Sequence, residues 1–451
     1  MSFAPSHTLG LDPALLLPPE RRGAYAVDGL LPSLVVRPRS VEEVSTVLAA
    51  AFQEGASLVP WGGGTRMALG AVPRSYHLAL DMTAIAEPLE HSPANLTVRV
   101  GAGITLEHLQ KTLRAHGQFL PIDPPLPTRA TIGGIMASSA YGPLCAGYGL
   151  PRDMVIGIAV VHANGTRTKS GGQVVKNVTG FEMHRLYTGS LGTLGVIVEV
   201  AFKVAPLPKE ECTLLALFPS AEGALGAGLA VVRAGLSPMA VEVLTASAWP
   251  LVYAPTLPLP PKDKRGYWLL LRFGGPPPAV ARQERDALAL CQRYGAGEDA
   301  GEVARGEEAR ALWRGVADFG WREPQPPLGV RISCLPRQGV QALALLEEVS
   351  SVPPLVNPAI ALHASAGVLR AFWSGGIPQD AIPEVSNALR TLRERVHALG
   401  GRMVLERAPR PLKDLIDPWD VSAETLGLQR SLKAQFDPKG VLNPGRFVGG
   451  I

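Results

Sequence analysis

A loop of small residues after a short apolar run has the composition of an anion-binding site built from main-chain amides. Leu58 and Val59 lead into Pro60-Trp61-Gly62-Gly63-Gly64-Thr65, and Gly70 closes the segment. Consecutive glycines can take positive φ, and N–H groups that converge form a concave nest for phosphate oxygens. A flexible surface turn has the same composition. We favour the anion-binding interpretation because matching segments follow along the chain.

Three more segments rich in small residues come later, in a fixed order. The first joins Asp123-Pro124-Pro125 to Arg129-Ala130-Thr131-Ile132-Gly133-Gly134, the second is G-G-Q-V-V-K-N-V-T-G at 171–180, and the third is G-S-L-G-T-L-G-V-I at 189–197. A flat ligand could approach the small residues of the first segment closely, with threonine and serine hydroxyls as donors. Tight packing of a buried turn is the alternative interpretation.

Two other nucleotide-binding patterns do not fit this chain. Gly101-Ala102-Gly103 has the start of a dinucleotide fingerprint, but Leu106 stands where the third glycine belongs, which disfavours a Rossmann fold. No G-x-x-x-x-G-K-[ST] occurs, which excludes a P-loop NTPase.

The four ordered segments together resemble a known cofactor-binding domain. The series P-x-G-G-G-T, D-P-P with T-I-G-G, K-N-V-x-G and G-S-x-G-T-L-G-V-I resembles the FAD-binding domain of the vanillyl-alcohol-oxidase superfamily, also called PCMH-type. The second and third segments, with F-D-P-K-G-V-L-N-P-G-R at 436–446, are similar to the family of smaller FAD-binding subunits of bacterial glycolate oxidase. The resemblance covers most of the chain and is weakest between Pro208 and Pro327.

The resemblance implies noncovalent FAD. The first loop holds Trp61 and glycines where some superfamily members carry a histidine that tethers the flavin. By the same resemblance, Trp61 to Thr65 hold the pyrophosphate, Thr131 to Ser138 line the isoalloxazine and phosphate, and Gly195 and Ile197 meet the adenine end. For Lys176 and Asn177, cofactor contact and bracing of a hairpin are both open. The predicted cofactor-binding residues are Pro60, Trp61, Gly62, Gly63, Gly64, Thr65, Gly70, Pro125, Thr131, Ile132, Gly133, Gly134, Ala137, Ser138, Gly195, Ile197 and Asn443.

Composition bounds the remaining classes of function. With 451 residues, of which 46% are hydrophobic, the chain can form two or three domains, each with its own core. A net charge of +4 with scattered Lys and Arg indicates no nucleic-acid role. The cysteines, Cys145, Cys212, Cys291 and Cys334, lack the spacing of a disulfide framework or an iron–sulfur site. No signal peptide is evident, and the uncharged stretches of membrane-span length contain prolines, so we expect a cytoplasmic protein that reaches the inner membrane only through partners.

Periodicity predicts an α+β chain with two kinds of domain. A helix begins at the capping box Ser40-Val41-Glu42-Glu43 and ends at Gly55, and Asn164-Gly165 predicts a type I′ hairpin turn. Strands and helices from 212 to 294 read as a split β-α-β, with a second set from 328 to 406. We therefore expect an N-terminal lead (1–29), a PCMH-type FAD-binding domain of two α/β subdomains (30–207), a ferredoxin-like antiparallel α+β cap (208–410) and a C-terminal segment that returns to the FAD domain (411–451).

The cap departs from the resembled family where substrate chemistry is expected. Catalytic hydroxyacid dehydrogenases carry H-x-G-D-G-N-x-H and a later E-H-G, whose histidines and glutamate bind a divalent metal. Here His363 is kept, but Arg370 and Arg407 stand at histidine positions, so the resemblance implies that the metal site is absent, because a guanidinium cannot coordinate a cation. The family's Trp-x-x-Arg keeps Trp313 but has Val316 in place of its arginine. We expect His363 to be a hydrogen-bonded core histidine, with a catalytic base as the alternative.

Two hypotheses of function follow, and both make the chain an FAD-dependent oxidoreductase. In the first it is the FAD-binding subunit of a glycolate oxidase-like 2-hydroxyacid oxidoreductase complex, relaying electrons or supporting a metal-bearing flavoprotein sister subunit and an iron–sulfur subunit. In the alternative it is a self-sufficient FAD-dependent 2-hydroxyacid dehydrogenase with a metal-free site, where Arg370 and Arg407 bind the carboxylate of a small 2-hydroxyacid.

Overall fold

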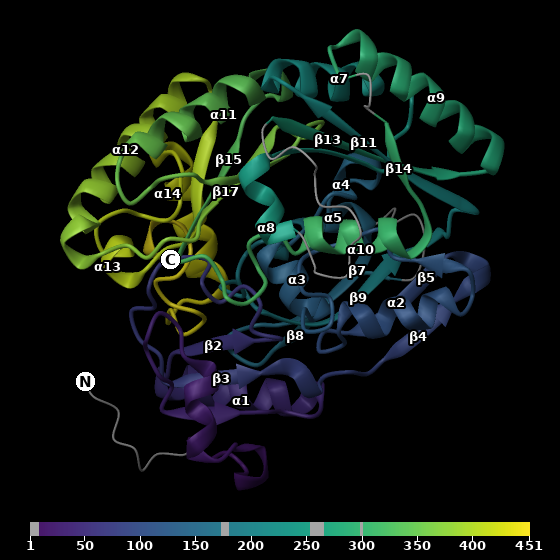
Figure 1. Ribbon diagram of the computed structural model, residues 1–451. Coiled ribbons are helices and arrows are strands. Elements are labelled where there is room, and N and C mark those ends of the chain that lie inside the picture. The colour runs from purple at the N-terminus through teal and green to yellow at the C-terminus, as the bar shows by residue number, and fades with distance from the viewer. Residues whose placement is uncertain (1–8, 173–179, 253–265, 298–300) are drawn as a thin grey trace. The chain divides into compact units, whose positions relative to one another are not determined.

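The chain folds into two compact units. A computed structural model describes residues 9–172, 180–252, 266–297 and 301–451 (Figure 1). The first unit comprises residues 1–140, 150–207 and 419–451, and the second comprises 141–149 and 208–418. The chain therefore passes through the second unit twice, briefly at 141–149 and then from Pro208 to Pro418, before it returns to the first.

A small parallel sheet of the first unit ends at the first glycine loop. Its strands, in spatial order, are β1 (Leu34–Val36), β3 (Leu78–Asp81) and β2 (Leu58–Trp61). Helix α1 (Val41–Glu54) precedes β2 and packs on it through Val44 and Leu48. The predicted helix boundaries are confirmed, because the Ser40 hydroxyl accepts the Glu43 N–H at 3.1 Å and Gly55 ends the helix at φ +67°.

An antiparallel sheet forms the other half of the first unit. Its order is β4 (Leu89–Ser92), β5 (Thr97–Gly101), β9 (Val196–Lys203), β7 (Val155–Val161) and β8 (Arg167–Gly171). The remaining elements of the unit are α2 (Leu106–Arg114), α3 (Ile132–Ser138), α5 (Pro151–Met154), α6 (His184–Tyr187), α14 (Ala423–Phe436) and the antiparallel pair β6 (Gln118–Phe119) and β10 (Ala205–Pro206). Val196 and Val198 of β9 share one core with Val44 and Leu48 of α1, so the two sheets of the unit are packed into one body.

The turn between β7 and β8 corrects one prediction. Gly165 has φ +85°, but Asn164 does not have the positive φ that a type I′ turn requires of both central residues. The Gly165 N–H donates to His162 O, and the His162 N–H donates to Thr166 O, each at 2.9 Å. The hairpin therefore closes with a longer loop, in which the Asn164 side chain accepts the Thr166 N–H at 3.0 Å.

The second unit is one antiparallel sheet made of two β-α-β-β-α-β sets. The first set is β11 (Glu210–Phe218), α7 (Ala221–Arg233), β12 (Ala240–Thr245), β13 (Tyr267–Gly275), α9 (Pro277–Arg293) and β14 (Glu302–Ala304). The second set is β15 (Leu328–Ser333), α11 (Gly339–Glu348), β16 (Ala359–His363), β17 (Val368–Trp373), α12 (Ile382–Ala398) and β18 (Arg402–Arg407). The strand order, β14-β11-β13-β12-β16-β17-β15-β18, joins the sets through β12 and β16.

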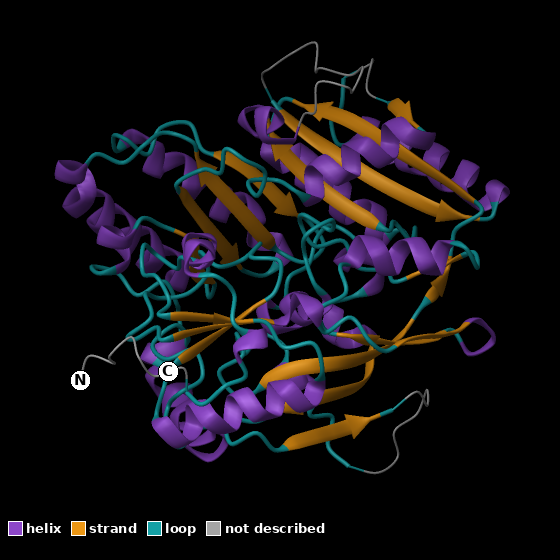
Figure 2. Ribbon diagram, turned by 90° about the horizontal axis from the view of Figure 1, so that it is seen from below, coloured by secondary structure: helices purple, strands orange, loops and turns teal. Residues whose placement is uncertain are grey.

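The four long helices of these sets cover one face of the sheet. Apolar side chains of α7, α9, α11 and α12 form a single core with the strands. Figure 2 shows helices in purple beside the orange strands of this sheet. Helix α10 (Gly306–Ala317) contacts β11, and the short helices α4 (Cys145–Tyr148), α8 (Trp249–Val252) and α13 (Arg410–Lys413) complete the unit. The predicted α+β class with ferredoxin-like halves is confirmed. Within the described ranges, no helix is both long and apolar enough to cross a membrane.

Candidate functional site

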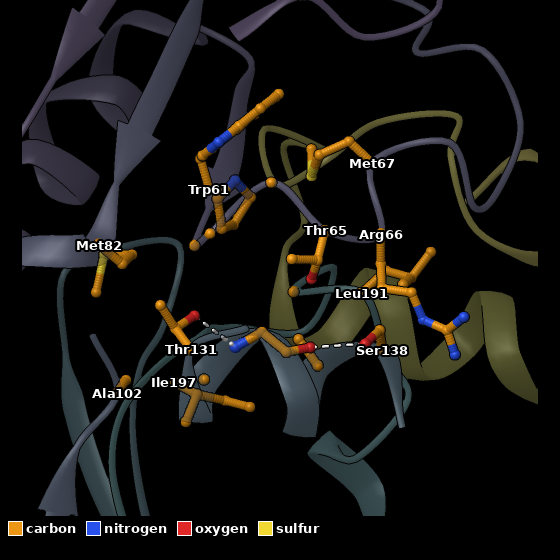
Figure 3. A pocket seen from close by; sticks show the side chains of 18 of the residues that line it. Trp61, Thr65, Arg66, Met67, Met82, Ala102, Thr131, Ser138, Leu191 and Ile197 are labelled. Atoms are coloured by element: carbon orange, nitrogen blue, oxygen red, sulfur yellow. Dashed lines mark hydrogen bonds between the residues drawn. The ribbon is translucent and has the colours of Figure 1, made fainter. Parts of the chain in front are cut away.

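A pocket of the first unit is enclosed by the glycine-rich loops. The space between its atoms, counted together with the open solvent at its mouth, is about 750 Å³. Figure 3 shows its lining side chains. Its lining residues are Pro60, Trp61, Gly62, Gly63, Gly64, Thr65, Arg66, Met67, Met82, Ala102, Thr131, Gly133, Gly134, Ala137, Ser138, Leu191, Gly192, Val196, Ile197, Asn443 and Arg446. Segments from four distant parts of the sequence thus meet around one cavity.

The three glycines after β2 are required mainly by close contact with the second loop. A Cβ on Gly62 would lie 2.2 Å from the Thr131 hydroxyl oxygen, and one on Gly63 would lie 1.7 Å from the Arg129 carbonyl oxygen. Of the three, Gly64 alone has a positive φ, at +68°. Left-handed backbone therefore accounts for Gly64, whereas lack of space against the Thr131 side chain and the Arg129 backbone accounts for Gly62 and Gly63.

The first loop leaves its main-chain donors unused by the protein. Among the described residues, the N–H groups of Gly62, Gly63, Gly64 and Thr65 donate to no other group. A run of unengaged amides that lines a cavity binds an anionic oxygen well, because each such hydrogen bond is charge-assisted. The loop therefore has the chemistry of the expected nest.

Helix α3 forms the facing wall of the pocket. Thr131 caps it by accepting the Gly134 N–H at 3.3 Å, and the Ser138 hydroxyl donates to Gly134 O at 2.7 Å, both drawn as dashed lines in Figure 3. The Gly133 N–H donates to Ala102 O at 2.8 Å. Helix α3 thus presents a small, hydrogen-bonded surface to the pocket, against which a flat group can lie.

The C-terminal segment contributes two polar side chains. The Asn443 amide nitrogen donates to Leu191 O at 2.7 Å, while its oxygen is buried without a partner in the described structure. The Arg446 guanidinium donates to Met67 O at 2.6 Å and to Leu69 O at 2.7 Å. Burial lowers the pKa of Arg446 to about 10, so it remains a cation at neutral pH. A pyrophosphate fits this wall, since a cation and unengaged amides face the same cavity.

Four of the predicted cofactor residues do not line the pocket. Gly70, at φ +94°, lies against the Arg446 carbonyl oxygen, and Ile132 and Pro125 are buried nearby. Gly195 packs on Val160, where a Cβ would meet a side-chain carbon at 2.4 Å. Lys176 and Asn177 lie outside the described residues.

Sequence reasoning missed several lining residues. Arg66 and Met67 directly follow the glycine loop, Gly192 lies inside the third segment, and Arg446 ends the tail motif, so adjacency to a motif was a usable signal for these. Met82 and Ala102 reach the pocket through folding alone.

The cap candidates His363 and Arg370 belong to a buried charged network of the second unit. His363 Nδ1 hydrogen-bonds Glu242, and Arg370 Nη1 lies 2.8 Å from His363 Nε2. Arg370 also lies 3.4 Å from Glu406 and donates to Tyr141 O at 3.4 Å, with its guanidinium 5.0 Å from the tyrosine ring centroid. Both terminal nitrogens of Arg370 are thus engaged within its own unit, while its Nε is buried near Glu406 and has no hydrogen-bond partner in the described structure.

The partner of His363 fixes its tautomer. A guanidinium can only donate, so His363 Nε2 accepts from Arg370 and the ring proton sits on Nδ1, where it donates to Glu242. Burial and the Arg370 charge lower the pKa of His363 well below its usual value, and burial raises that of Glu242. The imidazole has no free lone pair for a metal or a substrate proton. Among the described residues, no group of three His, Cys, Asp or Glu side chains could hold a metal ion.

Arg407 has different surroundings from Arg370. Its Nη1 donates to Gly320 O at 2.9 Å and to Pro326 O at 3.1 Å, and its guanidinium lies 4.8 Å from the Trp321 ring centroid. Its Nε and Nη2 are buried and have no hydrogen-bond partner in the described part of the chain. Burial lowers the pKa of Arg407 to about 10. The two arginines thus have different surroundings, and Arg407 has two buried nitrogens without a hydrogen-bond partner where Arg370 has one.

Trp313 makes its polar contact within the second unit. Its indole N–H donates to the Thr213 hydroxyl at 2.8 Å, and Val316 is buried one turn later. Both residues therefore pack α10 on β11.

Comparisons with known proteins agree with the pocket. The FAD binding domain family model matches residues 32–171, and the model of the C-terminal domain of FAD linked oxidases matches 207–349 and 418–447. The chain therefore belongs to the FAD-linked oxidases with a PCMH-type FAD-binding domain, and it is an FAD-dependent oxidoreductase. The predicted family, enzyme class and cofactor are confirmed.

Individual relatives refine this class. The chain is 29% identical over 424 residues to glycolate oxidase subunit GlcD of Bacillus subtilis, covering 92% of this chain and 89% of that protein. It is 28% identical over 425 residues to D-2-hydroxyglutarate dehydrogenase of Xanthomonas citri pv. viticola, with 92% and 89% covered. A solved structure of p-cresol methylhydroxylase with substrate bound matches with a TM-score of 0.74 at 15% identity, over 98% of this chain and 95% of that one, which supports the fold.

Proposed function

We propose that the chain is the FAD-binding subunit of a glycolate oxidase-like 2-hydroxyacid oxidoreductase complex, in which it relays electrons or supports a sister subunit that oxidises the substrate. The observation that carries this proposal is the closed network around His363. Both ring nitrogens are engaged, and the Arg370 guanidinium is held by His363, Glu406 and Tyr141. Apart from Arg370 Nε, which faces Glu406 at 3.4 Å without a hydrogen bond, neither side chain has a polar group left with which to bind a substrate.

The chain's own residues hold the cofactor in this proposal. FAD supplies a two-electron acceptor when bound. The amides of Gly62 to Thr65 bind the pyrophosphate, and the Arg446 cation balances its charge. Helix α3 gives the flat ring a small surface, and noncovalent binding follows from the absence of a tethering histidine in the first loop.

The test compares the isolated chain with the assembled complex. The purified chain is mixed anaerobically with glycolate or D-lactate, and the visible flavin band is followed. We expect little or no bleaching by the chain alone, and turnover after co-expression with a metal-bearing flavoprotein subunit and an iron–sulfur subunit. A stable assembly should bury at least about 1,000 Å². Rapid bleaching of the flavin in the isolated chain would contradict the relay proposal.

Arg407 favours a second candidate function, a self-sufficient 2-hydroxyacid dehydrogenase with a metal-free site. Two buried guanidinium nitrogens without partners are a suitable place for a carboxylate. The name of one relative, D-2-hydroxyglutarate dehydrogenase, is consistent with a substrate of this class.

One substitution separates the two functions. If Arg407 binds a substrate carboxylate, Arg407→Met should raise KM by roughly 10- to 150-fold, since a hydrogen bond to a charged group contributes about 1.5 to 3 kcal/mol. Arg272→Met is the matched control, because Arg272 also lies over a tryptophan, 5.9 Å from the Trp313 ring centroid, but is paired with Glu211 at 2.6 Å. Equal effects of the two variants, or none, would remove Arg407 from substrate binding.

A further inference from the structure

Helix α14, near the C-terminus, is attached to the first unit in an unusual way. Along α14, all of which the structure describes, Lys433 is the one buried residue. Leu428, the kind of side chain that usually anchors a helix, is 66% exposed. A charged side chain is rarely buried unless it is paired, so Lys433 needs a specific explanation.

The Lys433 ammonium has three partners, one for each of its N–H groups. It donates to Asp437 Oδ2 at 2.7 Å, to Leu442 O at 2.8 Å and to Thr193 O at 2.9 Å. Burial lowers its pKa, while Asp437 raises it. Three donors matched by three acceptors form a complete buried site, which an apolar side chain could not replace without leaving oxygens unpaired.

Thr193 and Leu442, two partners of Lys433, adjoin residues that line the cofactor pocket. Thr193 belongs to the third glycine segment, between the pocket residues Gly192 and Val196. Leu442 belongs to the tail, where the Asn443 N–H donates to Leu58 O at 2.7 Å and the Leu58 N–H donates to Val441 O at 2.8 Å. Leu58 begins β2, the strand that ends in the first glycine loop.

Asp437 completes the arrangement at the start of the tail. Its carboxylate accepts the Val441 N–H at 3.1 Å and the Leu442 N–H at 2.7 Å besides the Lys433 ammonium. The carboxylate thus bends the tail so that Leu442 O points back to Lys433. The turn and the lysine form one unit, which we name the Lys433 clamp (Lys433, Asp437, Leu442 and Thr193).

We propose that Lys433 is a positioning residue for the FAD site, because its clamp sets the separation between the first glycine loop (60–65) and the glycine segment at 189–197. The inference rests on FAD binding and is independent of which substrate or partner the chain has. Without the ammonium, the Thr193 and Leu442 carbonyl oxygens lose their common partner, and among the described residues the tail is tied to the 189–197 segment by the hydrogen bond from Asn443 to Leu191 O. The nest amides and the surface around Val196 then no longer meet the cofactor together.

The experiment titrates FAD into the full-length chain after the flavin has been removed. Lys433→Met should raise the Kd of FAD at least tenfold and change the visible circular dichroism of the bound flavin, since the pocket walls shift. The matched control is Lys439→Met. Lys439 lies in the same tail, donates to Gln53 O at 3.2 Å and lies 4.7 Å from the Phe52 ring centroid, but neither contact lines the pocket. The control should keep the wild-type Kd and flavin spectrum.

Two results would overturn the proposal. In one, Lys433→Met lowers the Tm of the flavin-free chain while the Kd and the flavin spectrum stay unchanged, which is the behaviour of a purely structural lysine. In the other, Lys439→Met raises the Kd of FAD as much as Lys433→Met does, which would mean that FAD binding depends on any attachment of the tail and not on Lys433 in particular.

A second measurement does not depend on whether the variant folds. Hydrogen exchange of the wild-type chain is compared with and without FAD. We expect the segments 190–195 and 437–443 to gain protection together, because the clamp joins them. Protection of 190–195 alone would contradict the coupling.

Discussion

Gly63→Ala should weaken FAD binding through a steric clash with the facing loop. The new Cβ would lie 1.7 Å from the Arg129 carbonyl oxygen and 2.6 Å from its carbon, both backbone atoms that cannot rotate away. The glycine loop must therefore move, and overpacking of this kind costs about 1 to 3 kcal/mol of stability. If the movement breaks one amide–phosphate hydrogen bond, the Kd of FAD should rise roughly 10- to 150-fold, from about 1.5 to 3 kcal/mol.

The assay is a fluorescence titration of FAD into the flavin-free chain, with the Tm measured in parallel. Gly23→Ala is the control, because a Cβ on Gly23 meets nothing within 4 Å. We expect the control to keep the wild-type Kd. A Gly63→Ala variant with wild-type affinity would refute the placement of the pyrophosphate on this loop, whatever its stability.

Three further predictions concern the second unit. Arg370→Met should destabilise it by about 3 to 5 kcal/mol in urea unfolding, because Glu406 loses a buried ion-pair partner. Burial raises the pKa of Cys212 to about 11 and that of Cys291 to about 12, so neither should react with a thiol reagent at about pH 8 until the chain unfolds, a reaction followed by mass spectrometry. The depressed pKa of His363 keeps it neutral in the folded chain, so stability is present above about pH 6.5 and is lost below it by up to about 1.4 kcal/mol per pH unit as the unfolded chain takes up a proton. His363→Gln should flatten this slope in urea unfolding, whereas a change at the exposed His397 should not.

The helices and strands could be predicted from the sequence wherever neighbouring residues determine where an element begins and ends. The Ser40 cap and Gly55 mark the ends of one helix because both act through neighbouring backbone groups. The two β-α-β-β-α-β sets follow from periodicity. Their union into one sheet through β12 and β16 did not, because that pairing joins residues more than 100 positions apart, such as Glu242 and His363.

The cofactor site could be predicted only in part, because local sequence patterns reveal some of its residues and long-range packing brings in the others. The first glycine loop can be recognised in the sequence because a Cβ on Gly62 would clash with the Thr131 hydroxyl and one on Gly63 with the Arg129 carbonyl oxygen, which favours glycine at both positions. Met82 and Ala102 belong to no motif, so only tertiary packing brings them to the pocket. The roles of His363 and Arg370 depended on Glu242, a strand residue that nothing in the sequence connects to either of them.

Buried cations are used in both units, and their partners tell which of them can act on a ligand. Lys433 donates all three of its N–H groups to oxygens of the chain. Arg370 is surrounded by His363, Glu406 and Tyr141. Such cations hold the fold, because any anion that approached would have to displace a partner that is already desolvated. Arg407 differs, since its carbonyl partners occupy one nitrogen and leave two buried nitrogens unpaired, whereas in Arg370 only Nε, which faces Glu406, lacks a hydrogen bond. Leaving a buried charged donor unsatisfied costs free energy, and an arriving carboxylate would recover it. If the second unit binds a 2-hydroxyacid, Arg407 is therefore where its carboxylate should be sought.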